Sequence, residues 1–326
     1  MRRNNRLKIL IILSLTVIII PNFPLSGGNN FLEARRVKET SDIYTSLSQT
    51  LIDIGYEKDS EEIIALIKNT FPDLNRLRNL SPEEKVNQLF MMIKEKIRPD
   101  EEVKIFDLIE VLRMKKANCL GYSQLFYVLG KSIGLEVKVI SVYPAHIANL
   151  ISLDSDYMIL DLMFNYKSHK FNWDNTYERR AGIWHLKVRS IILKIFNLRL
   201  LPEFYKFINI MGERGIIAAR YVSSGFYKAE AGQYEEAIAD YKRAIALDPE
   251  HIEAFYNLGV TQLELGLYEE AIKSFDQAAK LNPYDAKTFF NRGFAKEKLG
   301  RFQEAREDFE NAVCLRWYID PFVVKY

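Results

Sequence analysis

Three residues between Lys115 and Phe164 have side chains that together could catalyse acyl transfer. Cys119 offers a thiol that can attack a carbonyl carbon, and His146 offers an imidazole that can take up a proton and return it to a leaving group. Asp161 offers a carboxylate that can fix the orientation and the tautomer of that imidazole. The three residue types therefore suggest a nucleophile, a general base and an orienting acid.

The pattern around Cys119 predicts a helix followed by a strand. Cys119 opens an apolar helical run, Leu120 to Ser132, which ends at Gly134, a residue that readily adopts the left-handed helix end. Leu135 to Tyr143 then alternates with the two-residue period of a strand, and Pro144 ends it. A thiol at the N-terminus of a helix is favoured as a thiolate, because backbone N–H groups and the helix dipole stabilise negative charge there.

The next two elements are predicted to form a hairpin that brings His146 to Asp161. A strand begins at His146, the cluster Asp154-Ser155-Asp156 turns the chain, and Tyr157 to Phe164 returns as a second strand. If Asp154 and Ser155 form a two-residue loop, His146 faces Met163 across the hairpin. Asp161 is then a diagonal neighbour of His146 on the same face, within reach of its ring.

This arrangement resembles the transglutaminase-like superfamily of papain-type cysteine enzymes. The resemblance implies an α+β domain over residues 36–170, with N-terminal helices and a small antiparallel sheet. It also implies that Cys119 is the nucleophile, His146 the general base and acid, and Asp161 the orienting carboxylate. The sequence departs from the family pattern after two of these residues. His146-Ile147 lacks the frequent aromatic residue, and Asp161-Leu162-Met163 lacks the frequent Pro-Thr pair.

Each of the three residues also has a purely structural interpretation. A single cysteine in an apolar helix is ordinarily a small packing residue, and a single histidine on a strand is more often a packing residue than a base. Asp161 is less easily explained, because aspartate disfavours strands and resists burial without a partner. The three residues together, in this order and on these elements, favour the catalytic interpretation.

Composition excludes several functional classes. The chain has 326 residues, 48% of them hydrophobic and 27% charged, which is typical of globular proteins and leaves room for two domains. Its net charge is +2, and no basic run alternates with aromatic residues, so we expect no nucleic-acid partner. The two cysteines, Cys119 and Cys314, cannot build a disulfide framework, and Cys314 is expected to be a packing residue. No zinc spacing or calcium loop is present, so no metal or cofactor is predicted.

Residues 1–28 are predicted to be a targeting segment. Four basic residues precede the apolar run Ile9 to Ile20, which Pro21 ends. These basic residues are Arg2, Arg3, Arg6 and Lys8. As a helix the run would cover only about 18 Å of a roughly 30 Å hydrocarbon core, which suits a signal peptide. A tilted helix from Leu7 to Leu25 would instead be an uncleaved membrane anchor. Both alternatives predict an extracytoplasmic protein, secreted or tethered to the membrane.

Ser41 to Ala117 has the periodicity of several amphipathic helices. Two apolar stripes are Ile43, Leu47, Leu51 and Ile54, and Ile63, Ile64, Ile67 and Phe71. Ser81-Pro82-Glu83-Glu84 is a strong helix start, with a capping serine, a proline in the first helical position and a capping-box glutamate.

Residues 171–217 are predicted to be a helical connector. Ile183 to Leu201 is strongly apolar, and basic residues outnumber acidic ones around it. One interpretation is an amphipathic helix on an anionic membrane surface. We favour the other, a core helix whose long basic side chains reach outward while it joins two domains.

Residues 218–319 contain three blocks of 34 residues that align without gaps, 218–251, 252–285 and 286–319. The matched positions are Tyr221, Phe255 and Phe289; Gly225, Gly259 and Gly293; Gly232, Gly266 and Gly300; Ala237, Ala271 and Ala305; Tyr241, Phe275 and Phe309; and Ala244, Ala278 and Ala312. The blocks resemble tetratricopeptide (TPR) repeats. That resemblance implies an all-α solenoid of helical hairpins, in which glycines allow close approach and aromatic rings fill the gaps.

The TPR resemblance also implies a protein or peptide partner. Tyr256, Asn257, Phe290 and Asn291 occupy positions from which such repeats commonly hold an extended peptide, although each could equally be a structural residue. The C-terminal tail, residues 320–326, is apolar enough to cover the last helix or to dock on a partner.

The sequence leads to one main hypothesis and two alternatives. The main one is an exported or membrane-tethered transglutaminase-like cysteine hydrolase or peptidase that forms a thioester on Cys119 and binds protein through its repeats. In the second, the catalytic domain is silent and the repeats act as a scaffold. In the third, the domain is a papain-like cell-wall amidase, although that family usually has histidine or asparagine where this chain has Asp161.

Overall fold

The fold is known from a computed structural model. It describes residues 42–99, 105–142, 146–154, 156–163, 166–168, 177–180, 183–186 and 207–319. The predicted targeting segment 1–28 and the tail 320–326 lie outside these residues. Within the described ranges, no helix combines the length and the apolar character needed to cross a bilayer.

Helices dominate the chain before Cys119, as the sequence predicts. They are α2 (Ile43–Asp53), α3 (Ser60–Thr70), the 3-10 helix η1 (Leu74–Asn79), α4 (Pro82–Lys96) and α5 (Leu108–Met114). The capping box of α4 is present, because the Glu84 backbone N–H donates to the Ser81 hydroxyl and the Ser81 backbone N–H donates to the Glu84 carboxylate. Two short strands, β1 (Arg98–Pro99) and β2 (Lys116–Ala117), pair in parallel.

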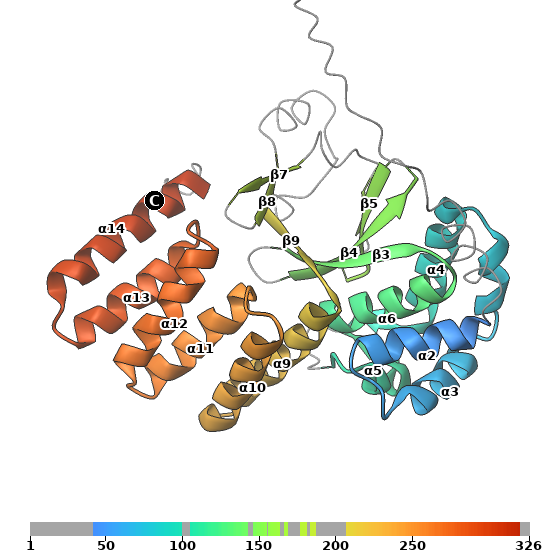
Figure 1. The fold of residues 1–326 in the computed structure, drawn as a ribbon, viewed down its shortest axis with the longest axis horizontal. Helices are drawn as coiled ribbons and strands as arrows, with labels where there is room; N and C mark the ends of the chain where they lie inside the picture. Colours follow the sequence, from blue (N-terminus) through green and yellow to red (C-terminus); the bar gives the residue numbers. More distant parts are fainter. Residues whose placement is uncertain are drawn as a thin grey trace, which may run out of the picture. The chain divides into compact units, whose positions relative to one another are not determined.

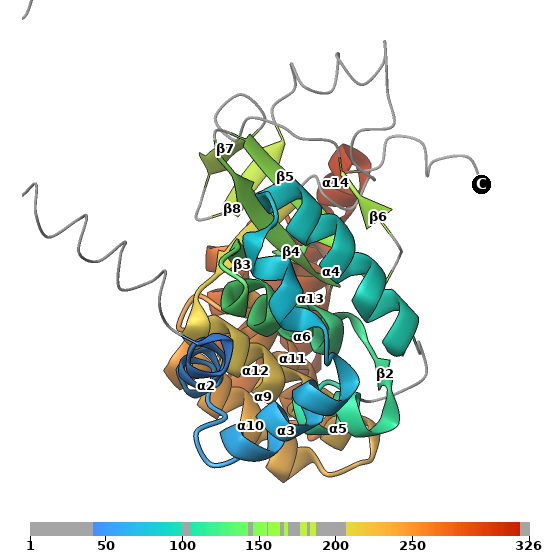
Figure 2. The same ribbon diagram turned by 90° about the vertical axis from the view of Figure 1, so that its right-hand side faces the viewer.

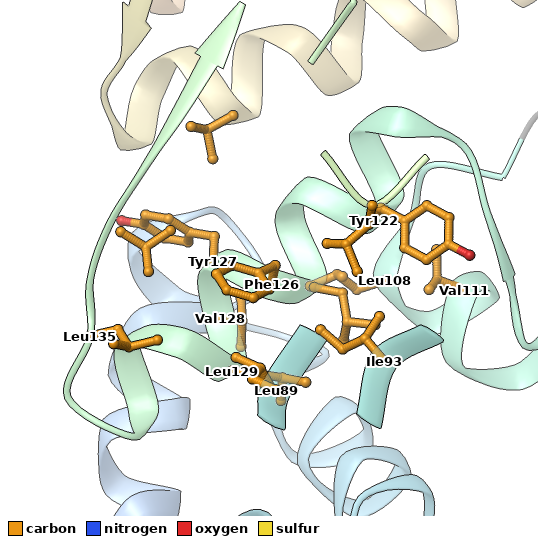
Figure 3. Packing of buried hydrophobic residues seen from close by; sticks show 14 of the residues in the cluster. Leu89, Ile93, Leu108, Val111, Tyr122, Phe126, Tyr127, Val128, Leu129 and Leu135 are labelled. Carbon is orange, nitrogen blue, oxygen red and sulfur yellow. The ribbon is translucent and has the colours of Figure 1, made fainter. Parts of the chain in front are cut away.

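Helix α6 (Cys119–Ser132) is the central helix of this domain. It is buried around almost its whole circumference, between the preceding helices and the sheet. Figures 1 and 2 show α4 beside it. Phe126 of α6 lies in one cluster with Leu89 and Ile93 of α4 (Figure 3). Gly134 follows the helix with φ +84°, the predicted left-handed end.

The sheet has seven strands, in the order β6-β5-β4-β3-β9-β8-β7. The strands are β3 (Glu136–Val142), β4 (His146–Leu153), β5 (Asp156–Asp161), β6 (Tyr166–Lys167), β7 (Tyr177–Arg180), β8 (Ile183–Leu186) and β9 (Phe207–Met211). All the pairings within the sheet are antiparallel. Figure 1 shows α6 below β3 and β4.

The β4–β5 hairpin has the predicted register. Leu153 pairs with Asp156 and Asn149 pairs with Leu160, as a two-residue loop requires. Asp154, in that loop, has φ +52°, a conformation that aspartate tolerates better than most residues. The second strand is shorter than predicted, because β5 ends at Asp161 rather than at Phe164.

The prediction of a helical connector over residues 171–217 is wrong for the residues that the structure describes there. They form β7, β8 and β9, and helix begins only at Glu213. The reason is tertiary pairing. Ile208 to Met211 hydrogen-bonds to the edge of β3 that β4 leaves open. The sheet therefore extends beyond residue 170, the predicted end of the domain. Residues 187–206, which contain the rest of the predicted connector helix, lie outside the described residues.

The three repeats form six helices, in pairs. They are α9 (Glu213–Glu230), α10 (Tyr234–Leu247), α11 (Ile252–Glu264), α12 (Tyr268–Leu281), α13 (Ala286–Lys298) and α14 (Phe302–Ile319). The predicted packing is confirmed in each pair, because a repeat glycine faces a repeat aromatic ring. A Cβ added to Gly259 would lie 2.7 Å from Phe275 Cε1, so only glycine allows the two helices to approach this closely.

Helix α9 joins the repeats to the domain that precedes them. Its residues Ile216 and Ala219 belong to the same hydrophobic cluster as α6. Arg220 lies over the ring of Tyr56, 3.8 Å from the ring centroid, and donates to the carbonyl of Ile54 at 3.1 Å. The first repeat helix is therefore part of the core of the preceding domain.

Candidate active site

Cys119 is the first residue of α6, as the sequence predicts. The side chain of Asn118 caps the helix by accepting a hydrogen bond from the backbone N–H of Gly121 at 3.0 Å. The helix starts tightly against its neighbours, since a Cβ on Gly121 would lie 2.8 Å from Val111 Cγ2. The thiol is partly exposed, so it is neither sealed in the core nor fully solvated.

His146 and Asp161 meet in the predicted way. His146 begins β4 and Asp161 ends β5, and the His146 Nε2 lies 2.6 Å from Asp161 Oδ2. Asp161 is only 2% exposed. A carboxylate this deeply buried needs a hydrogen-bonded or charged partner, which the imidazole supplies. The spacing of the hairpin alone was sufficient to predict this contact.

Three groups determine the protonation of His146. Burial by itself lowers the pKa of the imidazole, but the hydrogen bonds to Asp161 and to the Cys119 side chain, with the charges of both groups, raise it to about 9. The ring therefore carries a positive charge at neutral pH. All three sequence-predicted residues contribute to one local network.

A lysine that the sequence did not single out supports Asp161 from the side of α4. Lys94 Nζ donates to the carbonyl of Leu162 at 3.0 Å. Burial lowers the pKa of Lys94, while the charge of Asp161 partly opposes that change. The carboxylate of Asp161 thus has two cationic neighbours, the lysine and the imidazole.

Cys119 and His146 line one cavity of about 520 Å³. Apolar side chains of the strands and of α9 form much of its wall, including Ile147, Val222 and Phe226. Polar residues from the second and third repeats form the rest: His251, Glu253, Tyr256, Asn257, Asn282, Asp285 and Lys287. The thiol therefore opens into a space shared by the sheet domain and the repeats.

The four predicted peptide-binding residues of the repeats separate into two pairs. Tyr256 and Asn257 line the cavity that contains Cys119. Phe290 and Asn291 do not belong to its lining. Phe290 is largely exposed, and the Asn291 side-chain amide donates to the Tyr256 hydroxyl at 3.1 Å. Peptide binding by these residues remains a prediction.

Sequence reasoning missed four polar residues beside the thiol: Asn118, Ser141, His251 and Glu253. Asn118 had a local signal, because asparagine directly before an apolar helical run is a preferred N-cap. The other three had none. They meet only because a strand of the sheet and a repeat helix pack together. In the described part of the chain, no group of three or more histidine, cysteine, aspartate or glutamate side chains could hold a metal ion.

Comparison with protein families separates the chain into the same two parts. The profile of the transglutaminase-like superfamily matches residues 75–175. Three profiles of the tetratricopeptide repeat match residues 228–266, 252–285 and 286–315. The catalytic candidates Cys119, His146 and Asp161 all lie within the first match.

Several solved structures that resemble the chain are TPR domains. The second TPR domain of Spaghetti (RPAP3) with an HSP90 peptide is 36% identical, covering 30% of this chain and 91% of its own, with a TM-score of 0.30. The second TPR domain of human RPAP3 with an HSP70 peptide is also 36% identical, covering 30% of this chain and 82% of its own, with a TM-score of 0.30. The Arabidopsis OM64 TPR domain is 25% identical, covering 31% and 84%, with a TM-score of 0.31. No curated protein matches the chain.

Proposed function

Because this chain carries a transglutaminase-like domain followed by tetratricopeptide repeats, we propose that it is a cysteine enzyme that cleaves peptide or side-chain amides. One observation carries the proposal. The thiol of Cys119 and the 2.6 Å pair of His146 and Asp161 form one network at the wall of a cavity. The geometry has the three parts that acyl transfer to a thiol requires.

The first half of the reaction forms a thioester. The imidazolium of His146 favours the thiolate of Cys119, which attacks the carbonyl carbon of the amide. Because Nε2 contacts Asp161, Nδ1 is the ring nitrogen that gives its proton to the amide nitrogen. The C–N bond then breaks and the amine leaves. The developing oxyanion is stabilised by N–H groups at the start of α6, which have no acceptor within the helix.

The second half regenerates the thiol group. Water gives a proton to His146 and attacks the thioester carbon, the C–S bond breaks, and a carboxylic acid leaves. An amine in place of water would instead produce transamidation. We favour hydrolysis, because water is abundant and the cavity is open to it.

The remaining parts of the chain define where and on what the enzyme acts. We propose that residues 1–28 direct the protein out of the cytoplasm, as a cleaved signal peptide or as an anchor, because a basic stretch precedes a short apolar run. We also propose that the repeats bind a protein or peptide. The presence of Tyr256 and Asn257 in the wall of the catalytic cavity supports this second proposal.

Labelling with iodoacetamide tests the catalytic proposal without knowledge of the substrate. The expectation that Cys314 is a packing residue is wrong, because this residue is exposed. Cys119 should react near pH 7 much faster than Cys314, which serves as an internal reference on the same chain. His146→Ala should reduce the rate at Cys119 to that of Cys314 and leave Cys314 unchanged, as measured by mass spectrometry of the two peptides.

A different labelling result would favour the scaffold alternative. The departures from the family pattern after His146 and Asp161 are the reason for considering a silent catalytic domain. If Cys119 reacts as slowly as Cys314 and is insensitive to His146→Ala, the enzyme proposal is wrong. The protein is then a TPR scaffold with an inactive transglutaminase-like domain.

A further inference from the structure

The catalytic cavity contains a second polar group, built by the repeats. Ser141 of β3 donates to Glu253 Oε1 of α11 at 2.9 Å, and Glu253 Oε2 lies 3.2 Å from His251 Nδ1. Ser141 pairs with Ile147 in the sheet, next to His146 at the start of β4. The hydrogen bond from Ser141 therefore holds the repeat residues Glu253 and His251 close to the catalytic strand.

Neither ring nitrogen of His251 makes a well-aligned hydrogen bond, and only Nδ1 has a charged neighbour, Glu253 Oε2 at 3.2 Å. His251 is only 6% exposed, and its Nε2 has no partner among the described residues, although the ring lines the cavity. A buried ring nitrogen left without a partner destabilises a fold. Such atoms in folded proteins usually meet a ligand or water. Because His251 lines the cavity, a polar atom of a bound ligand is a candidate partner for this nitrogen.

The chemistry of His251 makes this nitrogen a donor. Burial lowers the pKa of the ring, but the contact with Glu253 and the charge of Asp248 raise it above its ordinary value. Glu253 Oε2 can only accept, so Nδ1, at 3.2 Å, carries a proton, and the negative charges of Glu253 and Asp248 favour a second proton at Nε2. A ligand atom that suits this donor is an acceptor oxygen.

We propose that His251 Nε2–H binds a main-chain carbonyl oxygen of the peptide whose acyl group Cys119 takes. The TPR repeats then form one wall of the substrate site instead of a separate docking module. This inference rests on the proposed function, since it assigns the class of substrate to that same site. The volume of about 520 Å³ lies within the range of roughly 300–1,000 Å³ that is usual for ligand pockets.

A neutral carbonyl fits this position better than a carboxylate. The positive charge of His251 is already neutralised by Glu253. An anion bound at His251 would therefore be repelled by the carboxylate of Glu253. Elsewhere in the lining, the repeats contribute one residue of each charge, the exposed Lys287 and the buried Asp285. The apolar part of the wall, with Val222, Phe226 and neighbouring residues, suits uncharged side chains of a peptide.

The test compares two alkylating probes at the same thiol. One is iodoacetamide, and the other is an equimolar mixture of tetrapeptide amides of uncharged residues, each carrying an N-terminal iodoacetyl group. With both, the sulfur of Cys119 displaces iodide and forms a thioether. Four extended residues span about 13 Å, enough to cross the cavity from the thiol. At each cysteine, the rate of labelling by the peptide probes is divided by the rate of labelling by iodoacetamide. The ratio at Cys119 is then divided by the ratio at the exposed Cys314, which gives the normalised ratio.

We expect this normalised ratio to be well above one in the wild-type chain. His251→Phe, which keeps a flat ring and removes the donor, should lower it about tenfold or more, the effect of one hydrogen bond from a charged donor. His251→Gln, whose neutral amide N–H can replace Nε2–H, should restore part of it. A ratio near one in the wild type, or a ratio that His251→Phe leaves unchanged, would overturn the proposal.

A measurement on the wild-type chain covers the case in which His251→Phe does not fold. The chain has four histidines, so a ¹⁵N-histidine spectrum can be assigned. The Nε2 signal of His251 should shift when Cys119 carries the peptide and remain unshifted when Cys119 carries only the acetamide group. An unshifted signal with the peptide adduct would overturn the proposal independently of any variant.

Two further comparisons separate the possible failures. A second probe mixture carries free C-terminal carboxylates in place of the amides. His251→Phe should lower the normalised ratio of these probes by no more than it lowers that of the amides. A larger decrease would show that His251 binds an anion and not a neutral carbonyl. The iodoacetamide rate alone reports on Cys119 and His146. A slow rate that is insensitive to His146→Ala refutes the proposed enzyme, whereas a fast rate with no dependence of the peptide ratio on His251 refutes only the subsite.

Discussion

The pair of His146 and Asp161 can be tested by removing one charge. Asp161→Asn keeps the shape of the side chain and one acceptor oxygen but removes the negative charge beside the imidazole. The pKa of His146 is about 9 because Asp161 and Cys119 outweigh the lowering by burial. Without the carboxylate, burial still lowers the pKa of His146, and the interaction with Asp161 no longer raises it. We therefore expect this pKa to fall to about 6.5 or below.

The expected size of this effect follows from the pKa change. A fall from about 9 to the ordinary value of 6.5 corresponds to roughly 3.5 kcal/mol of lost imidazolium stabilisation, at about 1.4 kcal/mol per pKa unit. At pH 7 most His146 rings would then be neutral instead of protonated. The thiol would lose its cationic neighbour, so the rate of iodoacetamide labelling at Cys119 near neutral pH should fall by one to two orders of magnitude.

The assay is an NMR titration of the His146 ring in the full chain, combined with the labelling rate at pH 7. Asp156→Asn is the matched control, because Asp156 lies on the same strand and pairs with Leu153 at the far end of the hairpin. That variant should leave both readings unchanged. A His146 that titrates near 6.5 in the wild type, or that stays near 9 in Asp161→Asn, would refute the reasoning.

Two further predictions concern stability. The folded-state pKa of His146 lies above its unfolded value, so its contribution to the free energy of unfolding is complete below pH 6.5 and is lost as the pH rises through about 9. Between pH 6.5 and about 9, the free energy of urea unfolding should therefore fall less in His146→Gln than in the wild type. An equal fall in the two proteins would contradict this prediction. Gly259→Ala brings a methyl group to 2.7 Å from the ring of Phe275, and should lower the free energy of unfolding by roughly 1–3 kcal/mol. Gly232→Ala is the comparison variant, because a Cβ there meets nothing within 4 Å while φ is +76°. It measures the cost of backbone strain without the steric clash that Gly259→Ala introduces. Equal stability of Gly259→Ala and wild type would contradict the packing argument.

The catalytic candidates could be predicted because their geometry is local. Cys119 lies at the start of a helix with a clear end at Gly134, and a two-residue loop fixes the register that brings Asp161 to His146. Likewise, the period of the repeats fixes which glycine faces which ring. In each case the contact depends on residues within about one or two elements of each other, where periodicity and turn chemistry decide the structure.

The strands after residue 170 could not be predicted for the opposite reason. Ile183 to Leu186 lies in a long apolar run, which fits a buried helix as well as a strand when periodicity alone is considered. What makes it a strand is its pairing with β9, which in turn pairs with β3, far earlier in the chain. Pairing between distant segments leaves no periodic signal in either segment.

The same limit applies to the wall of the cavity, and it has a functional consequence. Ser141 and Glu253 are 112 residues apart, and neither belongs to a recognisable motif. Because the triad candidates come from one part of the chain and His251 from the repeats, the function that we propose predicts that substitutions in the repeats change which peptide reaches Cys119 without altering the thiol itself. Two proteins with the same three catalytic residues could then act on different peptides, and the difference would lie in the repeat residues that face the cavity.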